Sequence, residues 1–251
     1  IFSETDIMDP GKMNAVVTDC IKIVPSHWKA LQQPGSLFAP RKCLISGGEQ
    51  LTKDVVDYIA SFNGTCTIFN HYGPTETTIG KLVHPVNAEQ PEQIPLGKPF
   101  CQGSVHILDQ HHHLCPIGVA GEICISGEGL ALGYLNAPEL TTEKFVHNPF
   151  RPGQLMYKTG DLGKRQPDGA IIFLGRKDKQ LKIRGYRIEP GEIENALLNL
   201  PGIQNAAVTT RLNKNAEAEL VAYFTGSKNW QPTELERPLG ESLPAYMLPH
   251  H

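Results

Sequence analysis

The chain has no block of basic residues and no large excess of charge of either sign. Its 251 residues carry a formal net charge of −3, and the charged residues are scattered along the sequence. Binding to nucleic acid or to a membrane surface therefore has no electrostatic support, and small molecules are the expected partners. Hydrophobic residues make up 40%, which suits one large core or one core with a small second domain.

Cysteine motifs and apolar runs of membrane length are also missing. The six cysteines lie far apart without a Cys-x-x-Cys pair, so we expect buried thiols in a reducing cytosol. No apolar run approaches a membrane span, and no charged segment followed by an apolar one marks a secretion signal. Because the chain begins at Ile1 and not at Met, we expect it to be a piece of a longer cytoplasmic protein.

The first third of the chain alternates between helical and extended patterns. It predicts helices at 10–18, after Pro25 and at 51–61, and strands at 21–24, 43–46 and 65–69. Such alternation indicates a parallel sheet. From about 81 to 174, short apolar runs separated by Gly and Pro predict antiparallel strands that form a distorted barrel, with one helix near 138–145.

After Gly175 the chain becomes strongly charged and then forms a smaller unit. Pro190 and the neighbouring glutamates suit the first turn of a helix over 190–200, since a helix N-terminus favours proline and acids. Two strands, near 203–211 and 218–225, and a weak helix at 232–242 follow. We therefore expect a larger domain, 1–177, and a small α+β domain, 178–251.

The most informative segment is Asn70-His71-Tyr72-Gly73-Pro74-Thr75-Glu76. It combines a ring that could stack on a base, a hydroxyl for a phosphate oxygen and an acid that could hold magnesium. We expect it as the loop leaving the strand at 65–69, where ligands bind in open α/β sheets. Taken alone, it could equally be a turn with Glu76 as a solvated charge.

Two later blocks favour the nucleotide-binding loop over the simple turn. Tyr157–Leu162 places Asp161 after a glycine turn, where it could accept from ribose hydroxyls or be a simple turn aspartate, and a third block runs from Gly175 to Glu194. With the three blocks in order, the chain resembles the adenylation domains of nonribosomal peptide synthetases. These belong to the adenylate-forming superfamily with acyl-CoA synthetases and luciferases. Gly121–Tyr134 matches a further family block, but Leu132 stands where Arg is usual.

The resemblance covers nearly the whole chain but only the later part of such a domain. It implies part of a large α/β core, with a β/α sheet and a distorted antiparallel β-barrel, followed by a small, truncated C-terminal α+β lid domain. The upstream phosphate loop and the downstream lysine loop would lie outside this chain. The fragment alone is therefore expected to be catalytically inactive.

The resemblance implies roles toward ATP or AMP and Mg²⁺. Tyr72 would stack on adenine, and Asn70 with the backbone of Gly47-Gly48 would line the base. Thr75 would contact the α-phosphate, and Glu76 would bind the magnesium.

Four further residues complete this implied site. Asp161 would accept from the ribose hydroxyls with Arg176 nearby as a fixed charge. The family often has Tyr where Phe173 stands, so one ribose hydrogen bond would be missing. Asp178 matches the hinge about which the small domain rotates, and the catalytic Lys182 would approach the site in only one of the two orientations.

The implied reaction has two steps. An amino-acid carboxylate attacks the α-phosphorus of ATP and releases pyrophosphate, and a phosphopantetheine thiol on a carrier domain then attacks the acyl-adenylate. Positioning and charge stabilisation carry both steps. A peptidyl carrier domain and a condensation domain of the parent synthetase would be the partners.

The family's substrate-pocket positions map onto Lys22, Ile45, Gly47, His71, Ile79 and Gly80. This set resembles the one that family members use for aspartate. A buried side-chain carboxylate is costly unless it is paired, and Lys22 with His71 could pair with it. Lys22 could instead lie on an edge strand with its ammonium in water. Asparagine is the nearest competing substrate.

Three alternative functions deserve a test. An acyl-CoA synthetase would share the reaction, whereas a non-catalytic nucleotide-binding or interaction module would be expected to have lost Glu76, Asp161 or Arg176. A metal protein could use the cluster His111–Cys115. We expect no metal there, because neighbouring residues of a strand alternate faces and the segment is typical of a hairpin turn.

Overall fold

A computed structural model describes residues 9–14, 17–31, 38–62, 65–87, 93–100, 103–214, 218–228 and 230–249. By its internal contacts the chain divides into two compact units, Ile1–Asp178 and Lys179–His251. That these units are part of a large core and a lid domain stays a prediction. In the described part of the chain, no helix has the length and apolarity needed to cross a membrane.

The first unit contains both predicted kinds of sheet. Its helices are α2 (Pro10–Asn14), α3 (Pro25–Leu31), α4 (Lys53–Phe62) and α5 (Pro138–Lys144), with a 3₁₀ turn, η1 (Thr75–Thr77). Its strands are β1 (Cys20–Ile23), β2 (Cys43–Gly47), β3 (Thr67–Tyr72), β4 (Leu82–Val86), β5 (Lys98–Pro99), β6 (Gly103–Leu108), β7 (Ala120–Gly127), β8 (Phe145–His147), β9 (Leu155–Arg165) and β10 (Ile171–Arg176).

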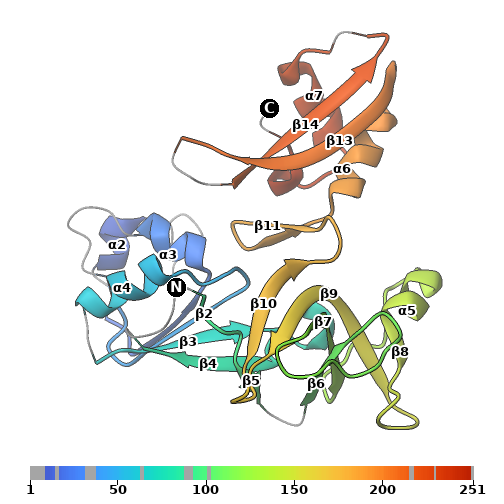
Figure 1. Ribbon diagram of the computed structural model, residues 1–251. Coiled ribbons are helices and arrows are strands. Elements are labelled where there is room, and N and C mark those ends of the chain that lie inside the picture. Colours follow the sequence, from blue (N-terminus) through green and yellow to red (C-terminus); the bar gives the residue numbers. More distant parts are fainter. Residues whose placement is uncertain are drawn as a thin grey trace. The chain divides into compact units, whose positions relative to one another are not determined.

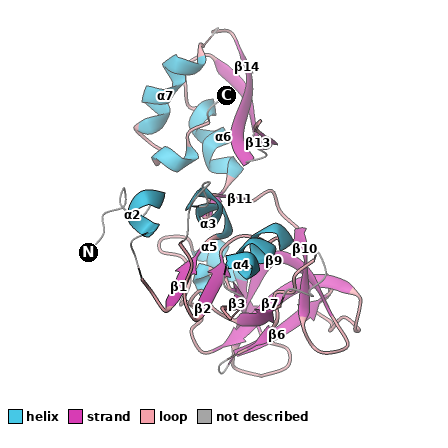
Figure 2. Ribbon diagram, turned by 90° about the vertical axis from the view of Figure 1, so that its left-hand side faces the viewer, coloured by secondary structure: helices cyan, strands magenta, loops and turns pink. Residues whose placement is uncertain are grey.

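The first sheet has the order β1-β2-β3-β4-β5. Strands β1, β2 and β3 are parallel, whereas β4 and β5 join antiparallel. Helices α3 and α4 cover one face of the parallel strands (Figures 1 and 2), where Trp28 and Val55 pack with Leu44 and Ile68. This arrangement confirms the predicted β/α sheet.

The second sheet is antiparallel, with the order β10-β9-β7-β6 and β8 added along β9. A shared hydrophobic cluster joins it to the first sheet, because Tyr72 and Leu82 pack with Ile107 and Ile123. The antiparallel pattern predicted for residues 81–174 is therefore confirmed.

Three local predictions are wrong. The helix expected at 10–18 ends at Asn14 in the described residues, since the carbonyl of Thr18 already accepts from the N–H of Arg41 beside the sheet. The strand expected at 65–69 continues to Tyr72, because β2 and β4 pair with it on both sides. The cysteines are not uniformly buried: Cys20 is exposed on β1, and only Cys124 is buried among those described, which exclude Cys101.

The second unit packs helices against an antiparallel pair of strands. It contains β11 (Leu181–Ile183), β12 (Tyr186–Ile188), α6 (Pro190–Leu198), β13 (Ile203–Leu212), β14 (Ala218–Gly226), α7 (Pro232–Gly240) and η2 (Ala245–Met247). Its core includes Ile188, Ile193, Leu220 and Leu239. Pro190 begins α6 as predicted.

Candidate active site

A bulge in β9 directs the side chain of Asp161 into the interior. The register of β9 against β7 shifts here, and Gly160 has the positive φ of 73°. The hydroxyl of Thr159 donates to the carbonyl of Ile123 at 2.8 Å and accepts from the N–H of Asp161 at 3.0 Å. Such bulges re-aim side chains beside functional sites. Asp161 is thus a strand residue, not the turn aspartate that the sequence allowed.

Asp161 is held by two of the other predicted residues. The hydroxyl of Tyr72 donates to its Oδ2 at 2.5 Å, and Nη1 of Arg176 donates to its Oδ1 at 2.5 Å. The side chains of Asp161 and Arg176 are only 4% and 12% exposed, so their charges are paired within the protein. The structure therefore brings together residues from three separate sequence blocks.

Tyr72 is buried and keeps its proton. Burial, and then the neighbouring Asp161 carboxylate, hold the pKa of its phenol well above the usual value. The hydroxyl is therefore a donor to Asp161 at any working pH. Its ring belongs to the cluster between the two sheets. Stacking of this ring on adenine stays a prediction.

Arg176 also holds Asp178. Its Nε and Nη2 each donate to one carboxylate oxygen of Asp178 at 2.6 Å, a bidentate arrangement. A side chain at Gly160 would obstruct this pair, since its Cβ would lie 2.6 Å from Oδ2 of Asp178. One arginine thus links the predicted ribose acceptor, Asp161, to the predicted hinge residue.

Glu76 is buried and is held by a loop that follows β7. The hydroxyl of Tyr134 donates to its Oε1 at 2.6 Å, and the N–H of Ala131 donates to its backbone carbonyl at 2.8 Å. Tyr134 was missed as a site residue, although it lies in a block that matches the family. Its place at the end of that block was the available signal.

Glu76 fits magnesium as a single protein ligand. Among the described residues, no group of three or more His, Cys, Asp or Glu side chains is arranged to hold a metal. Mg²⁺ is typically bound by one or two carboxylates together with phosphate oxygens and water. The carboxylate of Glu76 is the kind of oxygen ligand that a nucleotide-bound magnesium takes.

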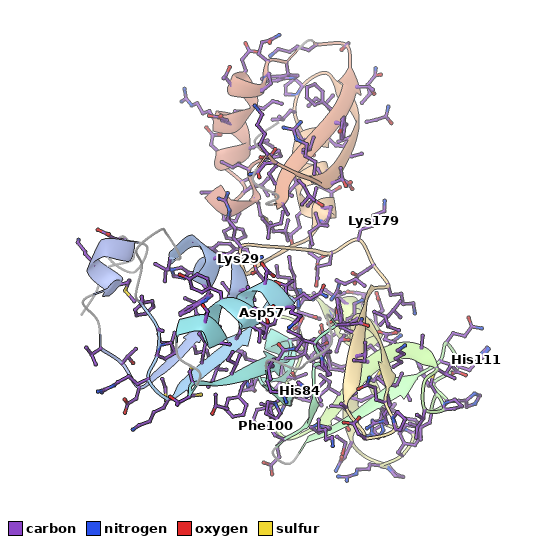
Figure 3. All side chains as sticks on the ribbon, turned by 60° about the vertical axis from the view of Figure 1, so that its left-hand side comes forward. Lys29, Asp57, His84, Phe100, His111 and Lys179 are labelled. Atoms are coloured by element: carbon purple, nitrogen blue, oxygen red, sulfur yellow. The ribbon has the colours of Figure 1, made fainter. Side chains whose placement is uncertain are left out.

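The cluster His111–Cys115 forms a turn. The carboxylate of Asp109 accepts from the N–H groups of His111 and His113 at 2.8 and 2.9 Å, and Leu108 bridges to Leu114. Figure 3 shows His111 projecting outward from this turn. The hairpin turn predicted for this segment is therefore present.

The amide of Asn70, a residue expected to line the base, bonds to the protein backbone. The amide of Asn70 is buried and donates to the carbonyl of Pro95 at 2.7 Å. Gly47 pairs with His71, the next residue along β3, so Asn70 and Gly47 face opposite sides of the sheet. Lining of the base by Asn70 and the backbone of Gly47-Gly48 stays a prediction.

The three other predicted nucleotide contacts are Gly48, Thr75 and Phe173. Gly48 follows β2 with a φ of 87°. Thr75 is exposed at the start of η1, next to Glu76. Phe173 is half-buried on β10 and packs against the cluster between the sheets.

Four predicted pocket residues share one face of the first sheet, opposite the helices. Lys22 is the register partner of Ile45, and Gly47 is the register partner of His71. Gly80 lies against the imidazole, because a Cβ there would be 2.3 Å from Nε2 of His71. Glycine at this position leaves room for the ring.

Ile79 completes the predicted pocket set near this face. Its side chain is 54% exposed and its φ is 63°. Its carbonyl oxygen would be 1.8 Å from a Cβ at Gly73. The chain between Gly73 and Gly80 therefore folds back closely on itself and carries Ile79 to the surface.

Lys22 and His71 interact electrostatically. Burial, and then the positive charge of Lys22, lower the pKa of His71 below 6.5. Lys22 itself is exposed, and β1 is an edge strand in the described part of the chain. A cavity of about 660 Å³ is lined by Lys22, Gly47, His27 and Phe38, among others.

Lys182 belongs to the second unit. It is exposed on β11, whose hairpin turns through Arg184 and Gly185 with φ values of 51° and 80°. Its approach to the nucleotide stays a prediction.

The sequence comparisons agree on one family. A family model described as AMP-binding enzyme matches residues 5–135. The chain is 52% identical over 210 residues to bacitracin synthase 1 of Bacillus licheniformis, covering 84% of this chain and 4% of that protein. It is 46% identical over 235 residues to tyrocidine synthase 3 of Brevibacillus parabrevis, covering 91% and 4%. The chain thus spans a small part of these relatives' length.

Solved structures show the same fold. PA1221, described as an NRPS protein containing adenylation and PCP domains, superposes with a TM-score of 0.84 at 31% identity, over 96% of this chain and 43% of that one. The Vibrio cholerae adenylation domain AlmE, in complex with glycyl-adenosine-5'-phosphate, superposes with a TM-score of 0.87 at 26% identity, over 99% and 49%.

Proposed function

This chain belongs to the family of AMP-binding enzymes, and we propose that its parent protein activates an amino acid with ATP and transfers it to a phosphopantetheine thiol. The chain would be the later part of the adenylation domain of a nonribosomal peptide synthetase. The observation that carries this proposal is the cluster of Tyr72, Asp161 and Arg176, three residues from separate blocks that meet in one buried network. A peptidyl carrier domain and a condensation domain would be its partners in the cytoplasm.

The nucleotide roles follow from the chemistry of the cluster. Asp161 accepts from Tyr72 and Arg176, and a carboxylate has further lone pairs that suit the ribose hydroxyls. Arg176 pairs with this acid, and Glu76 would hold a nucleotide-bound magnesium. That ion would supply positive charge that stabilises the negative charge of the phosphates. Thr75, exposed beside Glu76, would donate to the α-phosphate.

We further propose that the amino acid is aspartate. The support is the shared sheet face of Lys22 and His71, where burial and then the positive charge of Lys22 lower the pKa of His71. The lowered pKa of His71 makes its imidazole neutral at pH 7, so Lys22 would supply the positive charge and His71 a single N–H donor. Gly47 and Gly80 would leave space for a short acidic side chain.

Two rival functions fit less well. A non-catalytic module would be expected to have lost Glu76, Asp161 or Arg176, yet all three are present and paired. An acyl-CoA synthetase would share the reaction, but the segment Gly73–Glu76 resembles the peptide-synthetase branch.

The isolated chain would bind AMP weakly and would not catalyse amino-acid-dependent pyrophosphate exchange. The support for this part of the proposal is that the chain corresponds to 43% of PA1221 and 49% of AlmE. Robust exchange by the 251-residue chain would contradict it.

The experiment that tests the function is ATP–pyrophosphate exchange by the parent protein with aspartate, asparagine and glutamate. Aspartate should support the fastest exchange. Lys22→Met should reduce the preference for aspartate over asparagine by up to about fivefold, the factor that matches the ~1 kcal/mol upper end for a solvent-exposed pair. Lys29→Met, at an exposed lysine of α3 paired with Asp54, is the matched control and should leave the preference for aspartate over asparagine unchanged.

The possible failures can be told apart. If no amino acid supports exchange, the ligase proposal as a whole is rejected. Exchange with a different amino acid, or a Lys22→Met variant that keeps the preference for aspartate, would reject only the pocket assignment.

A further inference from the structure

We infer that Tyr134 is a positioning residue that orients the Glu76 carboxylate toward the magnesium of a bound nucleotide. This inference rests on the proposed function. The contact is direct: the phenolic hydroxyl donates to Oε1 of Glu76 at 2.6 Å, across 58 residues of sequence. Glu76 is only 7% exposed, so its carboxylate depends on the protein for hydrogen bonds.

The ring of Tyr134 is fixed by its neighbours. Its backbone N–H donates to the hydroxyl of Thr141 at 2.8 Å, and that hydroxyl donates to the carbonyl of Ala137 at 2.9 Å. Its ring meets Phe145 edge-on, with ring centroids 5.8 Å apart. Because both backbone and ring are anchored, the hydroxyl occupies a defined place.

The same loop also holds the backbone around Glu76. The N–H of Ala131 donates to the carbonyl of Glu76 at 2.8 Å, and the hydroxyl of Thr78 donates to the carbonyl of Gly129 at 2.7 Å. Lys81 donates to the carbonyl of Glu128 at 2.5 Å. The loop therefore fixes the η1 turn and the carboxylate together.

A neutral phenol suits this task chemically. The phenol bears no formal charge while it donates its proton to Glu76. Because it carries no positive charge, it orients the carboxylate without competing electrostatically with a metal ion. Groups that orient a ligating carboxylate in this way tune metal affinity.

The test is binding of Mn²⁺, in place of Mg²⁺, to the parent protein in the presence of ATP. It is measured in electron paramagnetic resonance as the loss of the free Mn²⁺ signal beyond the loss that the same ATP causes without protein. Tyr134→Phe keeps the ring and removes the hydroxyl. It should weaken Mn²⁺ binding by about 10–100-fold, the usual effect of losing such a partner. ATP binding without metal should be unchanged, which separates orientation of Glu76 from general damage.

Tyr223→Phe is the matched control. It makes the same chemical change at a tyrosine that is 61% exposed on β14. This variant should bind Mn²⁺ much as the wild type does. Equal Mn²⁺ binding by Tyr134→Phe and the wild type would overturn the inference, whereas a wild type that binds no Mn²⁺ with ATP would reject the proposed function itself.

A second variant covers the case in which Tyr134→Phe does not fold. Thr141→Val removes the hydroxyl that accepts from the backbone N–H of Tyr134, and it leaves the phenolic hydroxyl of Tyr134 in place. Mn²⁺ binding should weaken severalfold, and unchanged binding by a folded Thr141→Val protein would overturn the inference.

Discussion

Replacement of Arg176 by methionine should destabilise the first unit strongly. The Asp161 side chain is 4% exposed, and Arg176 neutralises it at 2.5 Å. Methionine keeps much of the length of the side chain and removes the charge, so it leaves a buried carboxylate without its ionic partner. Breaking a buried pair in this way costs about 3–5 kcal/mol. In a unit of this size that corresponds to a fall in Tm of roughly 6–20 °C.

Arg176 also has an exposed partner, which supplies the control. Asp178 is 38% exposed and binds the same guanidinium. Asp178→Asn should therefore cost less than about 1 kcal/mol, or at most about 4 °C. The double variant Arg176→Met with Asp161→Asn should recover part of the loss, because no buried charge is left without a partner.

The assay is thermal unfolding followed by far-ultraviolet circular dichroism, at low and at high salt. The Arg176→Met loss should persist at high salt, since buried pairs are weakly screened, whereas the small Asp178→Asn loss should shrink. The reasoning would be refuted if Arg176→Met lowered Tm no more than Asp178→Asn does, or if the double variant were less stable than Arg176→Met alone.

Two further predictions concern the pocket face. By NMR, His71 should titrate below pH 6.5, and Lys22→Met should raise its pKa only partway, because burial is the larger cause. Because its pKa is lower in the folded state than in the unfolded state, His71 contributes stability above pH 6.5 that is lost as the pH falls through the folded-state pKa. A His71 titration midpoint at the ordinary value would contradict this prediction. Gly47→Ala should destabilise by about 1–3 kcal/mol in urea unfolding, because its Cβ would lie 2.2 Å from the carbonyl oxygen of His71. Gly191→Ala, whose Cβ would meet nothing within 4 Å at the start of α6, should stabilise by about 0.5–1 kcal/mol, and equal effects of the two changes would exclude the steric explanation.

Elements were predicted well where neighbouring residues in the sequence carry the signal. Pro190 begins α6, because the residues that form a helix start lie next to one another in sequence. The end of β3 was misjudged, because Asn70, His71 and Tyr72 are extended through pairing with β2 and β4. That pairing depends on strands elsewhere in the chain.

The candidate site shows the same division. The motifs named Tyr72, Asp161 and Arg176, and the structure shows that they form one network. The motifs did not show that the amide of Asn70 donates to the carbonyl of Pro95, or that Arg176 also binds the carboxylate of Asp178. These contacts depend on which face of a strand each residue occupies and on a bulge in β9.

The sequence by itself determined the family and the β/α and antiparallel halves of the first unit, and it named the candidate site residues, because motifs and periodicity are properties of the linear sequence. Only the tertiary structure decided how those residues act on one another. It set the pairing of Asp161 with both Tyr72 and Arg176, the electrostatic effect of Lys22 on His71, and the hydrogen bond from Tyr134 to Glu76. The physical reason is that hydrogen bonds and charges act across space, between side chains that lie up to 89 residues apart.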